Sequence, residues 1–385
     1  MAFEFFDTAL KDKQEAGYLR RRHIVEYEKD GVICVNGEHY LNFASNDYLG
    51  MRQHPGVLQS WVEGLAQFGG GSGASPLVTG YTQAHSALEG YLEENLQREA
   101  VLLFNSGFAA NQAICQALFS NGGNAVADKY MHASFIDGVL ASNASFKRFR
   151  HNDTAHLQTL LDSSEGDTLV ASEGVFSMDG DSAPVDVLVK QCADKGAWLM
   201  LDDAHGFGVL GENGFGTAEL YQLSQQDVPV LMGTFGKAVG TAGAFVAGSQ
   251  AFIDYLVNTA RHYIYSTAMP ASQAIATLYS LTVIAGGEER GRLAENISHF
   301  RTVAAKQGLT LTESQSAIQP VICGDPHKAL ALSDALKQRG IWVPAIRYPT
   351  VPKGSDRLRI TLSASHSTKD IDVLVDALML AMESV

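Results

Sequence analysis

The stretch "WLMLDDAHGFG", Trp198 to Gly208, decides the fold class. Four apolar residues lead directly into two adjacent aspartates, and a histidine follows inside a glycine-containing turn. A short apolar run that ends in turn residues is typical of a strand buried on both faces of a sheet. We therefore predict a buried strand that delivers Asp202 and Asp203 to its end and places His205 in the turn beyond it.

Similar runs recur on both sides of this stretch and alternate with segments of helical length. They are "AVLLF", "TLVAS", "VPVLMG" and "AGAFVAG", all after about residue 100. Such alternation predicts an α/β fold with a mostly parallel central sheet, which we place in a large domain over residues 46–285. In sheets of this kind, binding and chemistry gather beyond the carboxyl ends of the strands.

The two ends of the chain predict smaller units. Residues 1–45 suggest an N-terminal helical segment with short strands, and 250–285 suggest mainly helix. Residues 286–385 contain the strand-like runs "AIQPVIC" and "RLRITLSA", separated by a helix near residues 327–339. This order predicts a smaller C-terminal α+β domain.

Composition excludes several classes of protein. The chain has 385 residues, of which 46% are hydrophobic and 18% charged, and its formal net charge is −14. That charge repels phosphate backbones and anionic lipid, so neither nucleic acid nor a membrane is an expected partner. The start, "MAFEFFDTALKDKQEAGYLRRR", has scattered charges and predicts an amphipathic helix and no export signal.

The cysteines are few and far apart. Cys34, Cys115, Cys192 and Cys323 form no C-x-x-C pair and no metal-ligand spacing. We expect buried, reduced thiols in a cytoplasmic protein without a bound metal.

A lysine stands alone among small residues in "GTFGKAVG", Gly233 to Gly240. A phosphate-binding P-loop is excluded, because Leu231 and Ala238 replace the first glycine and the hydroxyl residue of that motif. "FGGGSGASP" partly matches a dinucleotide motif, but a predicted helix precedes it, so a nicotinamide site is not expected. From this stretch alone, a structural lysine remains the simpler interpretation.

Two further stretches each admit a structural and a functional interpretation. One of the two aspartates could cap the next element; alternatively, a cationic ring nitrogen would satisfy a buried Asp202. In "LLFNSGFAANQ", a strand meets a helix start near Gly107, which is either a plain turn or an anion site. His132 in "MHAS" and Ser177 in "EGVFSMDGD" are equally compatible with ordinary turn residues.

Together, these features match the needs of pyridoxal 5′-phosphate (PLP). A lysine amine can hold the cofactor covalently, a carboxylate can keep the pyridine nitrogen protonated, and a helix start can bind the phosphate. Lys237, Asp202 and Gly107 are the candidates for these three tasks.

The sequence also resembles a known family. "SNDYLG", "GYTQAH", "SGFAAN", "EGVFSMDGD", "DDAHG", "TFGK" and "RLRITLSASH" are similar to motifs of the α-oxoamine synthases, enzymes of aminotransferase fold type I. The resemblance covers essentially the whole chain. "IYSTAMP" and "AIRYPTVPKGSDRLRITLSASH" most resemble members that condense L-alanine with a pimeloyl thioester in biotin biosynthesis. The alternative is a glycine-using member, a 2-amino-3-ketobutyrate ligase or a 5-aminolevulinate synthase.

The resemblance implies a role for each motif residue. Lys237, His132 and Asp202 would be catalytic: Lys237 would hold PLP, His132 would stack on its ring, and Asp202 would bind its ring nitrogen. The other implied cofactor contacts are Gly107, Phe108 and Thr234 at the phosphate and Ser177 and His205 at the ring hydroxyl. The implied substrate contacts are Arg359 and Asn46 for the amino acid carboxylate, His132, and Arg20 and Thr350 for the acyl group.

The resemblance also implies partners. Fold type I enzymes usually build each site across a dimer, so a homodimer is expected, and Ser266 and Thr267 would reach the phosphate of the neighbouring subunit. The acyl group could arrive on acyl carrier protein or on CoA. An acidic carrier protein would need a basic surface on this acidic chain, such as Arg20 to Arg22.

Overall fold

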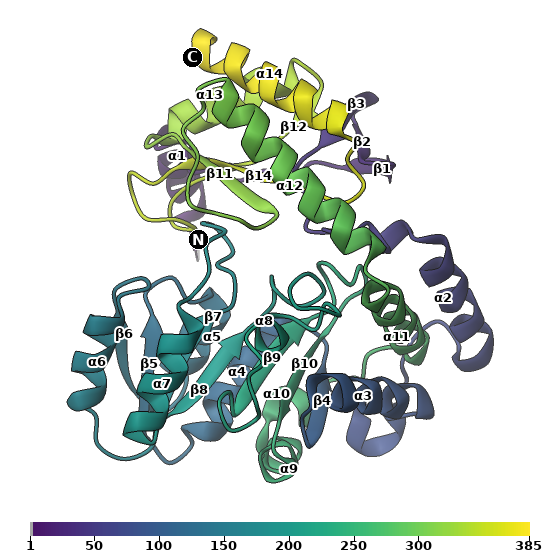
Figure 1. The fold of residues 1–385 in the computed structure, drawn as a ribbon, viewed down its shortest axis with the longest axis vertical. Helices are drawn as coiled ribbons and strands as arrows, with labels where there is room; N and C mark the ends of the chain where they lie inside the picture. The colour runs from purple at the N-terminus through teal and green to yellow at the C-terminus, as the bar shows by residue number, and fades with distance from the viewer. Residues whose placement is uncertain (1–2) are drawn as a thin grey trace. The chain divides into compact units, whose positions relative to one another are not determined.

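The computed structural model describes residues 3–385 and divides them into two compact units. The larger unit consists of residues 49–177 and 182–290, and the smaller unit of the described residues up to 48 together with 178–181 and 291–385. The ribbon is drawn in Figure 1. We describe each unit by itself.

A sheet of seven strands forms the centre of the larger unit, in the order β4-β10-β9-β8-β7-β5-β6. Its strands are β4 (Ala100–Phe104), β5 (Asn124–Asp128), β6 (Ser145–Phe149), β7 (Thr168–Glu173), β8 (Trp198–Asp202), β9 (Val230–Thr234) and β10 (Ala244–Gly248). β10 runs antiparallel to both of its neighbours, and the remaining pairs are parallel. The predicted α/β class with a mostly parallel sheet is therefore confirmed.

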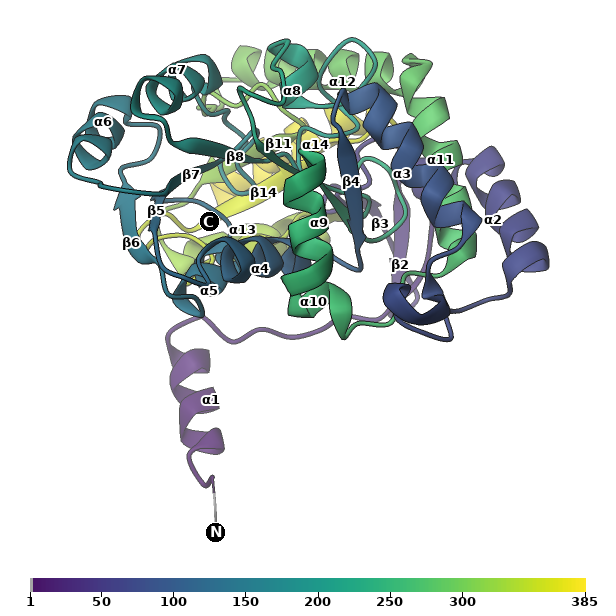
Figure 2. The ribbon, with the colours of Figure 1, turned by 90° about the horizontal axis from the view of Figure 1, so that it is seen from below.

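Helices cover both faces of this sheet, with α4, α5 and α9 on one face and α6 and α7 on the other (Figure 2). The buried apolar faces of α4 and α5 pack with β4, β5 and β10 in one continuous core. The unit's helices are α2 (Pro55–Phe68), α3 (Gln83–Leu96), α4 (Gly107–Leu118), α5 (Ala133–Leu140), α6 (Thr154–Asp162), α7 (Val185–Lys195), α8 (Thr217–Leu220), α9 (Gln250–Thr259), α10 (Arg261–Ile264) and α11 (Ala271–Ala285), with short helical turns η1 (Met51–Gln53) and η2 (Pro76–Gly80). The predicted helical stretch 250–285 is thus three helices.

The five apolar runs named from the sequence all became strands, whereas β5 and β6 were missed. β6, "SFKRF", lies at the edge of the sheet and buries only Phe149 fully. An edge strand with one side in solvent needs few apolar residues, so its sequence carries little strand signal.

The smaller unit contains two sheets, in the orders β1-β2-β3-β12 and β11-β14-β13. The strands are β1 (Val25–Lys29), β2 (Val32–Val35), β3 (Glu38–Asn42), β11 (Ile318–Ile322), β12 (Ile341–Trp342), β13 (Ala345–Ile346) and β14 (Arg357–Thr361), and the further helices of the chain are α1 (Phe6–Glu15), α12 (Glu288–Lys306), α13 (Pro326–Lys337) and α14 (Thr368–Ser384). Both strand-like runs predicted here, and the helix between them, are present.

Two expectations were only partly met. The N-terminal helix α1 ends at Glu15, so Arg20 to Arg22 lie beyond it, and none of its residues is buried. The four cysteines are free thiols, but Cys323, directly after β11, is only partly buried. Among residues 3–385, no helix combines the length and the apolar character that crossing a membrane requires.

Candidate active site

The candidate cofactor residues lie at the carboxyl ends of the strands of the large sheet. β4, β5, β7, β8 and β9 run in the same direction, so their carboxyl ends lie on the same side of the sheet. Asp202 and Thr234 are the last residues of β8 and β9. The other candidates follow in the next loop or helix start: Gly107 and Phe108 after β4, His132 after β5, Ser177 after β7, His205 after β8 and Lys237 after β9.

Asp202 is a buried carboxylate held by neutral donors. Its side chain is 4% exposed. Its Oδ2 accepts a hydrogen bond from Asn111 Nδ2 at 2.8 Å, and its Oδ1 accepts one from the backbone N–H of Ala204 at 3.1 Å. Neither donor carries a charge, and an ionised buried carboxylate is costly without a positive partner. The protonated ring nitrogen of PLP is a partner of the required charge.

The neighbouring Asp203 performs a different task. Its two carboxylate oxygens accept from the backbone N–H and the hydroxyl of Thr217, both at 2.6 Å. Asp203 thus fixes the start of α8, and the capping interpretation holds for this aspartate. Any Cβ added at Gly174, Gly206 or Gly216 would overlap its carboxylate.

Asp203 gives the folding free energy a defined pH dependence. Burial raises the pKa of Asp203 to about 7, and the hydrogen bonds from Thr217 oppose the shift. The folded chain therefore keeps a proton that the unfolded chain releases near pH 4, so this stabilisation is lost as pH rises from about 4 to about 7. We expect Asp203→Asn, which resembles the protonated acid, to reduce this loss in urea titrations across that range. An equally steep pH dependence in the variant would contradict the assignment.

Lys237 lies in a tight turn that small residues make possible. Gly240 has φ of +71°, and a Cβ there would overlap the backbone of Arg52. Lys237 Nζ lies 2.7 Å from Nε2 of the buried His205. A contact this short requires a lone pair on one nitrogen and a hydrogen on the other. The arrangement therefore gives Lys237 a hydrogen-bond partner that can itself exchange a proton.

His132 caps the start of α5. Its Nδ1 lies 2.8 Å from Ser134 Oγ and accepts from the backbone N–H of Ser134 at 3.3 Å. Although the residue as a whole is exposed, desolvation of its ring lowers the pKa of His132. The nearby charge of Asp202 raises that pKa and the charge of Lys237 lowers it.

The start of α4 and the end of β9 bring together groups that suit an anion. The N–H groups of Gly107 and Phe108 belong to the first turn of α4, where amides have no partner within the helix. A Cβ at Gly107 would lie 2.7 Å from Thr234 Cγ2, so the missing side chain lets the helix start approach the Thr234 hydroxyl. Backbone N–H groups, a helix dipole and a hydroxyl suit a phosphate.

This close approach predicts a specific rescue. Gly107→Ala should weaken PLP binding by about tenfold or more, because the added methyl pushes Thr234 from the helix start. Thr234→Ser keeps the hydroxyl and removes the conflicting methyl, so the double variant should recover most of the affinity. Dissociation constants from equilibrium dialysis provide the measurement. A double variant as weak as Gly107→Ala would show that the clash is not the cause.

With this geometry in place, known proteins can be compared. The family model described as aminotransferase class I and II matches residues 38–378. The 8-amino-7-oxononanoate synthase of Aeromonas salmonicida (strain A449) is 48% identical over 372 residues, covering 96% of this chain and 93% of the relative. That of Thioalkalivibrio sulfidiphilus (strain HL-EbGR7) is 46% identical over 374 residues, covering 96% and 95%. The chain belongs to the family of 8-amino-7-oxononanoate synthases.

Solved structures agree with membership of this synthase family. The 8-amino-7-oxononanoate synthase of Francisella tularensis is 31% identical with a TM-score of 0.77, covering 90% of this chain and 99% of the other. A serine palmitoyltransferase variant from S. paucimobilis, with PLP joined to myriocin, is 29% identical with a TM-score of 0.93 and covers 99% and 98%. The family, aminotransferase fold type I and the PLP cofactor are thus confirmed, and this synthase is a PLP-dependent enzyme.

Four of the five predicted substrate residues of the synthase form two pairs in its smaller unit, and the fifth, His132, lies in the larger unit. The buried Arg359 donates from Nη1 to Asn46 Oδ1 at 3.0 Å and to Thr361 Oγ1 at 2.8 Å. Arg20 Nη2 donates to Thr350 Oγ1 at 2.8 Å, with both residues exposed. Each pair joins residues more than 300 positions apart in the sequence. Their roles toward substrate stay predictions.

Sequence reasoning missed Glu173, at the end of β7. It is 2% exposed and stands opposite Asp202 in the register of β7 and β8. Its Oε2 accepts from the backbone N–H of Ser177 at 3.3 Å. Burial and then the charge of Asp202 raise its pKa well above the ordinary value, while Lys237 opposes the shift. The available signal was its position directly after the run "TLVAS".

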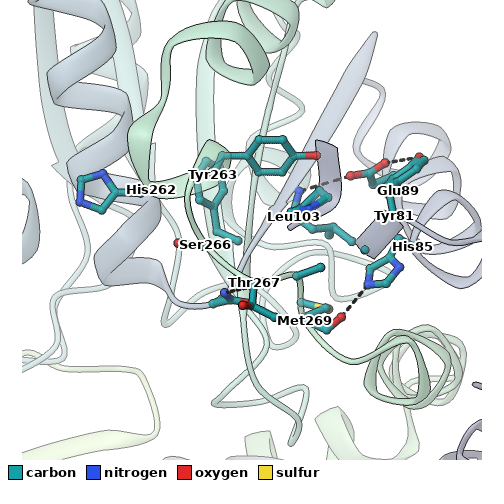
Figure 3. A pocket seen from close by; sticks show the side chains of 14 residues that line it. Tyr81, His85, Glu89, Leu103, His262, Tyr263, Ser266, Thr267 and Met269 are labelled. Carbon is teal, nitrogen blue, oxygen red and sulfur yellow. Dashed lines mark hydrogen bonds between the residues drawn. The ribbon is translucent and has the colours of Figure 1, made fainter. Parts of the chain in front are cut away.

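Ser266 and Thr267, the pair implied to reach a neighbouring subunit, line a separate small pocket in the larger unit of the synthase (Figure 3). On the far side of this pocket, Glu89 Oε2 accepts from Tyr81 Oη at 2.6 Å. Burial raises the pKa of Glu89 to about 7. The dashed lines in Figure 3 also mark the contact of His85 Nε2 with the Met269 carbonyl, which is 2.8 Å.

Proposed function

We propose that the enzyme condenses L-alanine with a pimeloyl thioester, releasing 8-amino-7-oxononanoate, CO₂ and the free thiol carrier, in biotin biosynthesis. The observation that carries the proposal is Lys237 Nζ at 2.7 Å from His205 beside the buried Asp202, in a chain 46–48% identical to named 8-amino-7-oxononanoate synthases. A lysine amine and a buried carboxylate are the two groups that PLP chemistry on an amino acid requires.

PLP, when bound, supplies an electron sink that stabilises a carbanion at Cα of the amino acid. The residues around the cofactor would have separate binding roles. Asp202 would hold the ring nitrogen protonated, and Gly107, Phe108 and Thr234 would bind the phosphate. Ser177 and His205 would contact the side of the ring that carries its hydroxyl.

Lys237 is the proposed acid and base. Its Nζ removes the Cα proton of alanine, so that Cα can attack the thioester carbonyl. The carbonyl C–S bond breaks and the thiol carrier leaves; after CO₂ is lost from Cα, Nζ returns a proton to that carbon. His205 Nε2 lies 2.7 Å from this amine, so the two nitrogens can share a hydrogen bond when Nζ is free. His132 has Nδ1 occupied by Ser134, so its Nε2–H is the group left to donate to a substrate oxygen.

Substrate recognition is assigned to both pairs of the smaller unit. We propose that Arg359, oriented by Asn46 and Thr361, binds the carboxylate of the amino acid, since a guanidinium matches a carboxylate in geometry and charge. Arg20 and Thr350 would contact the acyl substrate. Arg347 adds positive charge there: burial, and then the charge of Arg20, lower its pKa.

The decisive experiment is a product assay with a grid of substrates. L-alanine and glycine are each combined with pimeloyl, acetyl and succinyl thioesters, and the amino ketone is identified by mass spectrometry. We expect 8-amino-7-oxononanoate from alanine and the pimeloyl donor as the fastest combination. Faster turnover of glycine with acetyl or succinyl thioester would assign the enzyme to the glycine-using alternative.

The same assay distinguishes the acyl carrier. Pimeloyl-acyl carrier protein and pimeloyl-CoA are compared at equal concentration. We propose that a carrier protein, if used, approaches the basic run Arg20 to Arg22, since the enzyme's charge of −14 otherwise repels an acidic partner. We also propose that the enzyme is a homodimer and acts in the cytoplasm. Light scattering of the purified protein tests the oligomeric state.

A further inference from the structure

Asn111, on α4, connects the end of β8 to the start of α5. Its side chain is 1% exposed, and its Nδ2 donates to Asp202 Oδ2 at 2.8 Å and to Ser134 Oγ at 2.9 Å. One acceptor is the last residue of β8 and the other lies in the first turn of α5. Both N–H groups of a single amide are therefore committed, one to each element.

The second arm of this connection continues to His132. The backbone N–H of Ser134 can only donate, so His132 Nδ1 must carry a lone pair and the ring proton resides on Nε2. Ser134 Oγ lies 2.8 Å from the same Nδ1. Because Asn111 donates to this oxygen, the hydroxyl hydrogen is left to point at His132. The amide thus reaches the imidazole through one hydroxyl.

The remaining atom of the amide shows what fixes its orientation. Asn111 Oδ1 is buried and has no hydrogen-bond partner among residues 3–385. An unpaired buried acceptor is unfavourable, and turning the amide would instead place that oxygen against the Asp202 carboxylate. The orientation is therefore set by the two neighbours that need donors.

We propose that Asn111 is a positioning residue that joins the two sides of the PLP site: it would hold the Asp202 carboxylate in place as the acceptor for the ring nitrogen and, through Ser134, keep His132 in its Nε2–H form. The inference rests on PLP dependence and not on the choice of substrates. Asn111 itself touches no reacting atom in this assignment.

The test separates the two arms with matched variants of the full-length enzyme. Asn111→Leu removes both arms at similar volume, whereas Ser134→Ala removes only the one to His132. Two quantities are measured: the dissociation constant for PLP, and the pKa of His132 from ¹⁵N-histidine NMR of the holoenzyme. The His132 signal is assigned by its loss in His132→Gln.

We expect Asn111→Leu to weaken PLP binding about tenfold, the effect of one lost hydrogen bond to a charged group. Ser134→Ala should leave PLP affinity within about twofold, because Asp202 keeps its donor. Ser134→Ala should raise the His132 pKa, because the neutral ring loses the hydroxyl that donates to Nδ1. Asn111→Leu should raise that pKa by a smaller amount, because the Ser134 hydroxyl remains but loses the amide that orients it.

A variant that preserves shape covers the case in which Asn111→Leu does not fold. Asn111→Asp places a second carboxylate against Asp202, so its PLP affinity should fall more steeply with rising pH than that of the wild type. PLP affinity and His132 titration unchanged in both Asn111 variants would overturn the proposal. So would a loss of PLP in Ser134→Ala equal to that in Asn111→Leu. None of these measurements needs product, so a failed substrate assay leaves them valid.

Discussion

Lys237→Ala will abolish turnover and remove the yellow, borohydride-reducible absorbance of the purified enzyme. Both effects have one cause, because in the proposed mechanism the same Nζ holds PLP covalently and moves the Cα proton. Losing the two roles together should lower kcat by at least about 10⁴-fold. Absorption spectra before and after borohydride, followed by peptide mapping, locate the attachment.

The control for this result is Lys190→Ala. Lys190 is an exposed lysine on α7 that pairs with Asp194, one helical turn away. It should keep the spectrum and the rate of the wild type. Full activity in Lys237→Ala, or a reduced peptide that maps to another lysine, would refute both the proposed mechanism and the assignment of the cofactor lysine.

Asp202→Asn should lower kcat strongly, with an effect second only to that of removing Lys237. The amide keeps the size of the side chain but cannot carry the negative charge that the proposed role toward the ring nitrogen requires, and its NH₂ would face one of two donors, Asn111 Nδ2 or the Ala204 N–H. We expect kcat to fall by about 10²–10⁴-fold and PLP to dissociate more readily. Steady-state kinetics at saturating PLP separates the two effects.

The adjacent aspartate provides a matched control. Asp203→Asn changes the same residue type one position later, where the carboxylate serves Thr217. This variant should retain the cofactor spectrum and most of the activity. Equal losses at the two positions would indicate a general disturbance of the β8 loop and would remove Asp202 from its assigned role.

The sequence was most informative where a whole run of residues is buried. β4, β7, β8, β9 and β10 are mostly apolar runs, which is the pattern of strands covered on both faces. The common direction of β8 and β9 then placed Asp202, Thr234 and Lys237 at the same end of the sheet. Strands of only two residues, such as β12 and β13, left no comparable signal in the sequence.

The finer geometry of the site depends on contacts that a linear pattern does not contain. Asp202 and Asp203 look alike in sequence; Asn111, 91 positions away from Asp202, and Thr217, 14 positions from Asp203, give them separate tasks. Asn111 had one local signal, since it follows Gly107 by four residues and so shares its helix face. Nothing near Glu173 indicated that its neighbour across the sheet would be another carboxylate.

The crowding around Asp203 limits how this region can change. Gly174, Gly206 and Gly216 come from separate parts of the chain, yet each leaves room for the same carboxylate. A larger residue at any one of them requires a smaller one at position 203, which would in turn release Thr217 and the start of α8. A single substitution at one of these glycines is therefore expected to disrupt the packing around Asp203 unless a second substitution compensates for it. Selection or directed evolution for altered substrate range is expected to leave these four positions fixed and to act elsewhere, such as around Arg20 and Thr350.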